Sequence, residues 1–111
     1  MPKNIPQNIV NAINKLLTQL SKTIKIERVY LYGSYAKGTW IKTSDIDLII
    51  VSKDFEGISF LKRLDLVNKI IWEARITPHI EVIPLTPSEL EKKIKSSVVI
   101  SDASKYWIKI R

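Results

Sequence analysis

Residues 29–51 decide the fold, and they read VYLYGSYAKGTWIKTSDIDLIIV. Two runs rich in β-branched and aromatic residues, one ending at Tyr32 and one spanning Ile46 to Val51, are typical of β-strands. The first run begins at Ile26 and stops at Gly33, because glycine permits a tight turn or a positive φ angle. The connection between the runs is too short for a helical crossover, so we predict an antiparallel pair within a mixed sheet.

Further elements are expected before and after this pair of strands in the sequence. Apolar residues at helical spacing predict amphipathic helices over residues 6–22 and 59–75. A third strand is expected over residues 79–85, and a capping box at residues 86–89 predicts a short helix over residues 87–95. The order of elements predicts an α+β, two-layer fold in which helices pack on a small mixed β-sheet.

Length and composition limit the class of protein. A chain of 111 residues with 45% hydrophobic residues is expected to form one domain over residues 1–111 with a packed core. It has no cysteine, which excludes disulfides and thiol catalysis, and no apolar run long enough for a membrane span. Without an apolar leader at the N-terminus, we expect a cytoplasmic protein with no membrane partner.

Asp45 and Asp47 are the first candidate functional residues. Side chains two positions apart in a strand share a face, so both carboxylates are expected together while Ile46 faces away. Two close carboxylates repel each other, and a divalent cation such as Mg²⁺, which prefers oxygen ligands, would offset that repulsion. The alternative is that Asp45 belongs to an ordinary turn and Asp47 ends the strand in solvent.

The turn at Gly33 and Ser34 is the second candidate. A glycine lets the backbone approach a phosphate closely, backbone amides of a turn can bind anions, and Ser34 adds a hydroxyl donor. Lys37 could contact phosphates as a point charge. The alternatives are an ordinary turn after a strand and a solvated lysine. Together, a phosphate turn and two carboxylates are what metal-assisted transfer from a nucleoside triphosphate requires.

The spacing of these residues resembles a known superfamily. Gly33-Ser34, ten residues, then Asp45-x-Asp47, within GSYAKG…SDIDLIIV, is similar to the signature of DNA-polymerase-β-like nucleotidyltransferases, in their minimal (MNT) branch. The resemblance implies a polymerase-β-like fold, triphosphate binding by Gly33 and Ser34, and Mg²⁺ or Mn²⁺ on Asp45 and Asp47. It also implies a third carboxylate on the third strand, where Glu81 is the acidic residue present. Glu81 could bind metal and act as general base, or it could be a surface glutamate on an edge strand.

The same resemblance suggests a partner. Many MNT proteins pair with a HEPN-domain protein as the antitoxin of a toxin–antitoxin system, in some cases transferring AMP from ATP to a tyrosine. The resemblance thus implies a nucleotidyltransferase that uses ATP or another nucleoside triphosphate, and an alternative is a non-catalytic antitoxin that occludes the HEPN ribonuclease. The apolar tail at residues 105–110 could contact a HEPN chain, mediate self-association, form an edge strand or cover the core. The net charge of +7 comes from scattered lysines, so a nucleic-acid partner is not expected.

Overall fold

The computed structural model describes residues 4–111, and within them four strands form one mixed sheet in the order β3-β2-β1-β4. The bounds are β1 Arg28–Tyr32, β2 Ile46–Val51, β3 Ile80–Leu85 and β4 Ile108–Lys109. β1 is antiparallel to β2 and to β4, whereas β2 and β3 are parallel and joined through a helix. The mixed sheet with an antiparallel first pair is therefore confirmed.

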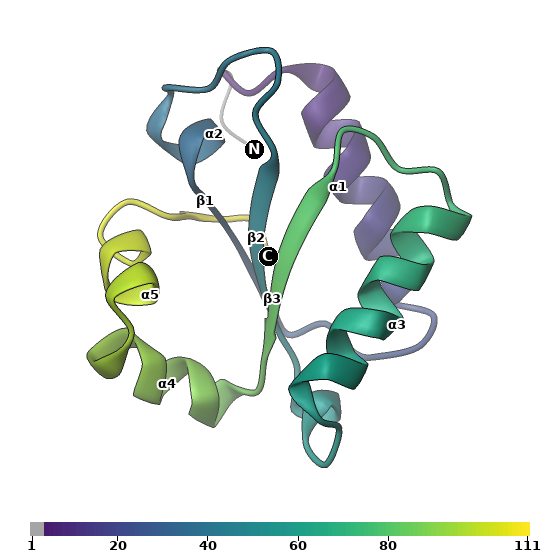
Figure 1. The fold of residues 1–111 in the computed structure, drawn as a ribbon, viewed down its shortest axis with the longest axis vertical. Helices are drawn as coiled ribbons and strands as arrows, with labels where there is room; N and C mark the ends of the chain where they lie inside the picture. Colours follow the sequence, from purple (N-terminus) through teal and green to yellow (C-terminus); the bar gives the residue numbers. More distant parts are fainter. Residues whose placement is uncertain (1–3) are drawn as a thin grey trace.

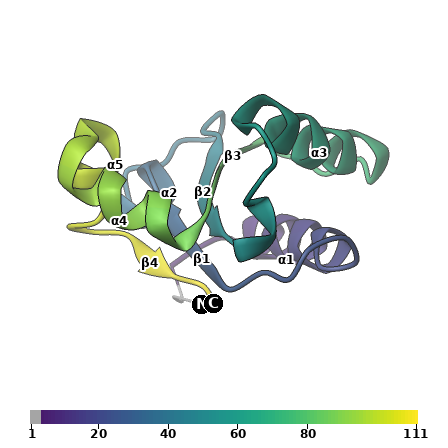
Figure 2. The same cartoon turned by 90° about the horizontal axis from the view of Figure 1, so that it is seen from below.

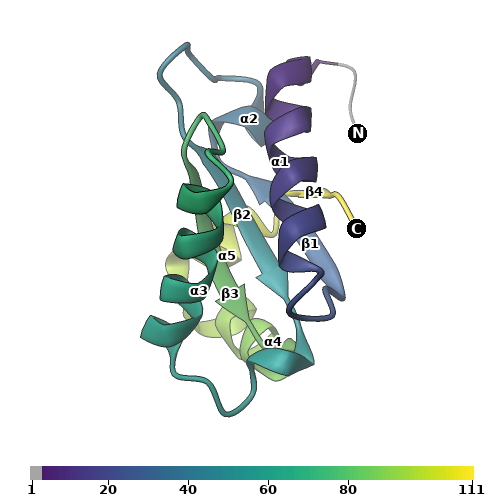
Figure 3. The ribbon, with the colours of Figure 1, turned by 90° about the vertical axis from the view of Figure 1, so that its right-hand side faces the viewer.

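Helices cover both faces of this sheet (Figures 1 and 2). α1 (Gln7–Leu20) and α3 (Phe60–Glu73) lie on one face, and α4 (Pro87–Ser96) and α5 (Val98–Ala103) lie on the other. A single turn, α2 (Ser34–Lys37), follows β1, and a 3-10 turn, η1 (Lys53–Phe55), follows β2. Figure 3 shows α1 and α3 side by side in front of the sheet. No helix within residues 4–111 is both long and apolar enough to cross a membrane.

The alternation of side chains along β2 divides the core into two parts. Ile46, Leu48 and Ile50 are fully buried against the α1 and α3 side, where the larger cluster lies. Ile49 and Val51 point to the opposite face and join a smaller cluster beneath α4 and α5. A strand buried on both faces reads as a nearly continuous apolar run, which is why β2 was recognisable from sequence.

The tail supplies the elements that local sequence signals left open. β4 is the edge strand that was one of the alternatives, and it pairs Ile108 with Leu31 of β1. Trp107 stacks on Tyr30 with ring centroids 4.1 Å apart and packs against the smaller cluster. The tail therefore covers the protein's own core, and the helix α5 that precedes it was not predicted.

Candidate nucleotide site

Three strand ends place one row of polar side chains at one end of the sheet. The register pairs Tyr32 at the end of β1 with Asp47 near the start of β2, and Asp47 with Glu81 near the start of β3. Residues directly opposite each other in paired strands point to the same face of a sheet. Tyr32, Asp47 and Glu81 therefore lie side by side on the face that carries α4 and α5, at the edge of the smaller core cluster, against which Tyr32 packs.

Gly33 packs directly against the central carboxylate of this row. Its backbone has φ 74° and ψ −158°, a region that glycine alone adopts without strain. A Cβ atom added at Gly33 would overlap the Oδ2 atom of Asp47. Both the backbone angle and the close approach require glycine, so the turn residue and the aspartate predicted from sequence are in contact.

Negative charge and partial burial set the electrostatics of the row. The pKa of Asp47 rises from 3.8 to about 6, first because burial removes water and then because Glu81 and Asp45 lie nearby. The pKa of Tyr32 rises to about 12, mainly through burial and then through Asp47 and Glu81, with a smaller contribution from Tyr106. Tyr32 thus keeps its proton at neutral pH and can donate a hydrogen bond.

The three carboxylates that the sequence predicts to bind metal differ in their exposure to solvent. Asp45 is exposed in the loop just before β2, Asp47 is half-buried, and Glu81 is exposed on β3. Within residues 4–111, no group of three or more His, Asp or Glu side chains stands close enough together to hold a metal ion without movement. The donor set nevertheless fits a hard cation, because carboxylate oxygens are its preferred ligands and Asp47 gains from a neutralising charge.

The turn at Gly33 and Ser34, which the sequence predicts to bind phosphate, makes a contact that no sequence motif indicates. The Gly33 backbone N–H donates to the hydroxyl oxygen of Tyr106 over 3.3 Å. The Lys37 ammonium lies over the Tyr106 ring, 4.6 Å from its centroid. Tyr106 is 73 positions from Gly33 in the chain, so no motif could have linked them. Gly33 and Lys37, two of the three residues predicted to contact phosphate, are therefore engaged by the tail.

Two other aromatic or titratable residues have clear places. Trp40 stacks on the buried Tyr35, with the two ring centroids 5.6 Å apart. The stack anchors the loop that leads to β2. His79, the sole histidine of the sequence, is exposed just before β3 and lines the cavity described next.

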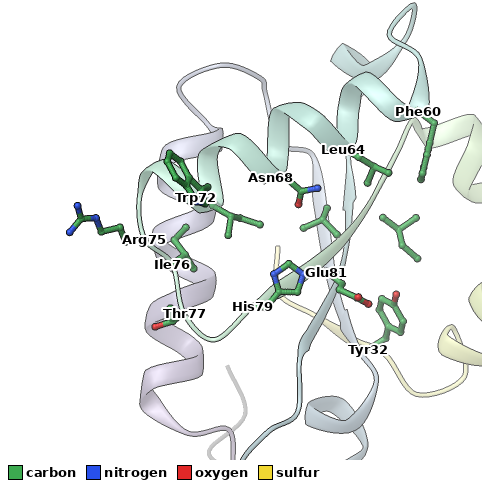
Figure 4. Close-up of a pocket in the computed structure, with 13 residues that line it drawn as sticks. Tyr32, Phe60, Leu64, Asn68, Trp72, Arg75, Ile76, Thr77, His79 and Glu81 are labelled. Carbon is green, nitrogen blue, oxygen red and sulfur yellow. The ribbon is translucent and has the colours of Figure 1, made fainter.

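A groove of about 910 Å³ opens beside this row of polar side chains, which we call the carboxylate row (Figure 4). Its apolar wall comes from α3, which contributes Phe60, Leu64 and Trp72 among others. Glu81 and Tyr32 lie at its other side, so the groove reaches the row of polar side chains. The groove is therefore continuous with the candidate site, whereas Gly33 and Asp47 lie beyond its lining.

Comparison with known proteins places this geometry in a family. The family model described as nucleotidyltransferase domain matches residues 13–107. A protein of Methanocaldococcus jannaschii assigned as protein adenylyltransferase MJ0141 is 28% identical over 104 residues, covering 92% of this chain and 98% of that protein. Protein adenylyltransferase MntA of Shewanella oneidensis is 34% identical over 58 residues, covering 51% of this chain and 40% of MntA. Another relative is likewise matched over only 59% of its length.

Solved structures share the fold. A protein of Sulfolobus solfataricus assigned as a nucleotidyltransferase gives a TM-score of 0.62 at 22% identity, covering 83% of this chain and 82% of that chain. A toxin–antitoxin structure with AMP-PNP gives 0.59 at 22% identity, covering 91% of this chain and 71% of that chain. At such identities the likeness concerns the fold alone. Because the family model matches most of the chain, the chain belongs to the nucleotidyltransferase domain family, and it has the polymerase-β-like fold of its structural neighbours.

Proposed function

We propose that this protein transfers a nucleoside monophosphate, AMP from ATP, to a hydroxyl group of a partner protein. The observation that carries the proposal is the contact between Gly33 and Asp47, which joins the phosphate turn to the carboxylate row. Membership of the nucleotidyltransferase family supports the reaction class. Relatives named protein adenylyltransferase support a protein acceptor.

The order of residues across the sheet suits an in-line displacement. The turn at Gly33 follows β1, Asp47 lies on β2, and Glu81 lies on β3. With the triphosphate on Gly33, Ser34 and Lys37, pyrophosphate leaves on the β1 side and the acceptor hydroxyl enters on the β3 side. The groove beside Glu81 opens on that entry side.

Each proposed residue then has a defined task. The acceptor oxygen forms a bond to the α-phosphorus, the bond from that phosphorus to the bridging oxygen breaks, and pyrophosphate leaves with the electron pair. Glu81 accepts the hydroxyl proton, and Tyr32, which stays protonated, donates to a phosphate oxygen. Asp45, Asp47 and Glu81 would hold Mg²⁺ or Mn²⁺, which would neutralise charge on the phosphates and the transferring group.

The partner in this proposal is a HEPN-domain protein, with this chain as the antitoxin of the pair. Support comes from the fold shared with a toxin–antitoxin structure and from the partial match to MntA. Modification of a hydroxyl on the partner, rather than occlusion alone, would then neutralise it.

The first experiment measures ATP binding by isothermal titration calorimetry, with Mg²⁺ and with EDTA. Wild type is compared with a double variant, Asp45→Asn with Asp47→Asn. A matched control, Asp65→Asn with Asp102→Asn, makes the same change in net charge at exposed helical positions. We expect Mg²⁺-dependent binding in wild type and control, and its loss in the site variant. Binding that survives in the site variant would contradict the proposed site.

A second assay tests transfer, using α-labelled ATP and a purified HEPN-domain partner. We expect label on the partner with wild type and control, and at least about a hundredfold less with the site variant, because positioning and charge neutralisation supply most of the catalysis. If the site variant still neutralised the partner without labelling it, occlusion would be the mechanism.

A further inference from the structure

The tail places Tyr106 where the proposed function puts a phosphate. The Tyr106 hydroxyl accepts the Gly33 N–H, which is the first backbone donor of the turn. Its ring lies beneath the Lys37 ammonium, the positive charge nearest that turn along the chain. The same phenol lies near enough to Tyr32 to influence its pKa. One side chain therefore engages the Gly33 amide and the Lys37 ammonium, two of the groups proposed to bind the triphosphate.

The residues that follow Tyr106 hold it in this position. Trp107 stacks on Tyr30, and Ile108 pairs with Leu31 in the sheet. The backbone of the tail is tied to β1 once more, because the Val29 carbonyl accepts the N–H of Ile110 over 2.8 Å. Tyr106 is thus carried on an anchored segment, which keeps its side chain within reach of the turn.

The contacts that Tyr106 itself makes are weak compared with this anchor. A distance of 3.3 Å is at the long end for an N–H···O hydrogen bond, and the acceptor is a neutral phenol. A phosphate oxygen would be the stronger partner for both the amide and the ammonium, because hydrogen bonds to a charged acceptor are shorter and stronger. A triphosphate can therefore exchange with the phenol at modest cost.

We infer that Tyr106 is a gate on the phosphate turn: its hydroxyl and ring occupy the Gly33 amide and the Lys37 ammonium until the triphosphate displaces them. This inference rests on the proposed function, since it assigns the turn to a triphosphate. The closed gate lowers the apparent affinity for every ligand that carries the phosphates, by the fraction of molecules in which the turn is open. It leaves unchanged the affinity of a ligand without phosphates.

The test compares wild type with Tyr106→Phe, which keeps the ring and removes the competing hydroxyl. Tyr30→Phe is the matched control, because it removes a phenol hydroxyl from the same anchored region but away from the turn. Calorimetry measures binding of ATP with Mg²⁺, of inorganic tripolyphosphate and of adenosine. Circular dichroism confirms that all three proteins are folded.

We expect Tyr106→Phe to bind ATP and tripolyphosphate about two- to tenfold more tightly than wild type, the effect of removing one neutral hydrogen bond that opposes binding. Adenosine binding should not change, and Tyr30→Phe should resemble wild type. Equal or weaker binding of tripolyphosphate by Tyr106→Phe would overturn the gate, because the hydroxyl would then be neutral or a phosphate ligand. A lack of ATP binding in wild type and Tyr106→Phe alike would instead overturn the proposed function, and the gate with it.

Discussion

At the scale of single residues, the contact between Gly33 and Asp47 links backbone conformation to the proposed chemistry. Only glycine fits the φ and ψ angles found there, and only a residue without Cβ leaves room for Oδ2 of Asp47. The carboxylate is thereby held against the phosphate turn, instead of rotating into solvent. The sequence predicted a phosphate-binding role for Gly33 and a metal-binding role for Asp47, but it did not predict their direct contact, which depends on how β1 and β2 pair.

Gly33→Ala should destabilise the protein more than an alanine at another glycine with positive φ. Gly57 is the matched control, because its φ is 80° and a Cβ there would meet nothing within 4 Å. We expect Gly57→Ala to lower the free energy of unfolding by about 1 kcal/mol, and Gly33→Ala by about 2 to 4 kcal/mol, since strain and overlap add. Urea unfolding measures both. Equal losses would show that the Asp47 contact does not constrain the turn.

Asp47→Asn should stabilise the protein at neutral pH in EDTA. An acid whose pKa is raised on folding, here from 3.8 to about 6, favours the folded state only while protonated. Wild-type stability therefore falls as pH rises from about 4 to about 6. The asparagine variant should not show this fall, because it has no carboxyl group to ionise at this position. We expect a gain of about 1 to 2 kcal/mol at pH 7, after allowing for the solvent that reaches a half-buried carboxyl.

The measurement is urea unfolding of wild type and Asp47→Asn at pH 4 and pH 7. The gain should vanish at pH 4, where the carboxyl is protonated in most molecules. Asp102→Asn, at an exposed position of α5, is the control and should show no such pH dependence. A variant less stable than wild type at pH 7 would mean that the Asp47 carboxylate supports the fold instead of opposing it.

At the scale of elements, the end of the sheet opposite the candidate site is fixed by one buried arginine. Arg63 of α3 is 5% exposed and donates to the carbonyls of Ile58 and Pro84. It also forms a two-pronged ion pair with Glu89 of α4, at 2.6 and 3.2 Å. Glu89 in turn completes the capping box with Thr86. These bonds join α3, β3 and α4, so they fix the strand that carries Glu81.

Glu89→Gln should weaken this junction, because the buried Arg63 guanidinium loses its counter-charge. The expected loss in free energy of unfolding is about 1 to 3 kcal/mol, reduced from that of a fully buried pair by the exposure of Glu89. Glu91→Gln, an exposed change on the same helix, should alter stability by less than about 0.5 kcal/mol. Thermal unfolding at pH 7 compares them, and equal effects would mean that the ion pair adds nothing.

The Glu89 effect should also depend on pH in a defined direction. The hydrogen bond from Arg63, and then that from the Thr86 backbone, lower the pKa of Glu89 below its ordinary value of 4.5. A carboxyl group whose pKa is lowered on folding stabilises the folded state at pH values above its ordinary pKa. That stability is lost as pH falls through the pKa of the folded state. The difference between wild type and Glu89→Gln should therefore be full at pH 7 and shrink below about pH 4.

The elements that were predicted are those with strong local signals. The capping box of α4 and the apolar run of β2 carry their signals within a few residues, and both lie where expected. α5 has a capping serine, Ser97, but it has only six residues and its apolar Val98 is 85% exposed, so its sequence gives no amphipathic pattern. β4 has only two residues and exists through its pairing with β1. Tertiary contacts, which a local pattern does not contain, form both elements.

At the scale of the whole molecule, the tail ties the two parts of the core to the candidate site. Trp107 packs on the smaller cluster, Ile108 packs against the larger one, and Tyr106 contacts the phosphate turn. The sequence showed that this apolar segment needed a surface, yet left open whether the surface belonged to a partner. Its own sheet provides that surface, so the tail is part of the fold and also contacts the candidate site.

Trp107 and Trp72 allow a tryptophan that packs on the core to be compared with one that is exposed. Trp107→Ala removes the stack on Tyr30 and part of the cover of the smaller cluster, so we expect it to lower the free energy of unfolding by about 2 to 4 kcal/mol. Trp72 is 81% exposed on α3, so Trp72→Ala should cost less than about 0.5 kcal/mol. Urea unfolding of both variants at pH 7 measures the contrast.

The same pair also tests whether the tail and the phosphate turn are coupled. Trp107 anchors the segment that positions Tyr106, whereas Trp72 lines the groove on the far side of Glu81. Losing the anchor should free Tyr106 and speed hydrogen exchange of the Gly33 amide, while Trp72→Ala should leave that amide unchanged. Unaltered exchange in a folded Trp107→Ala variant would show that Tyr106 holds the turn without help from the anchor.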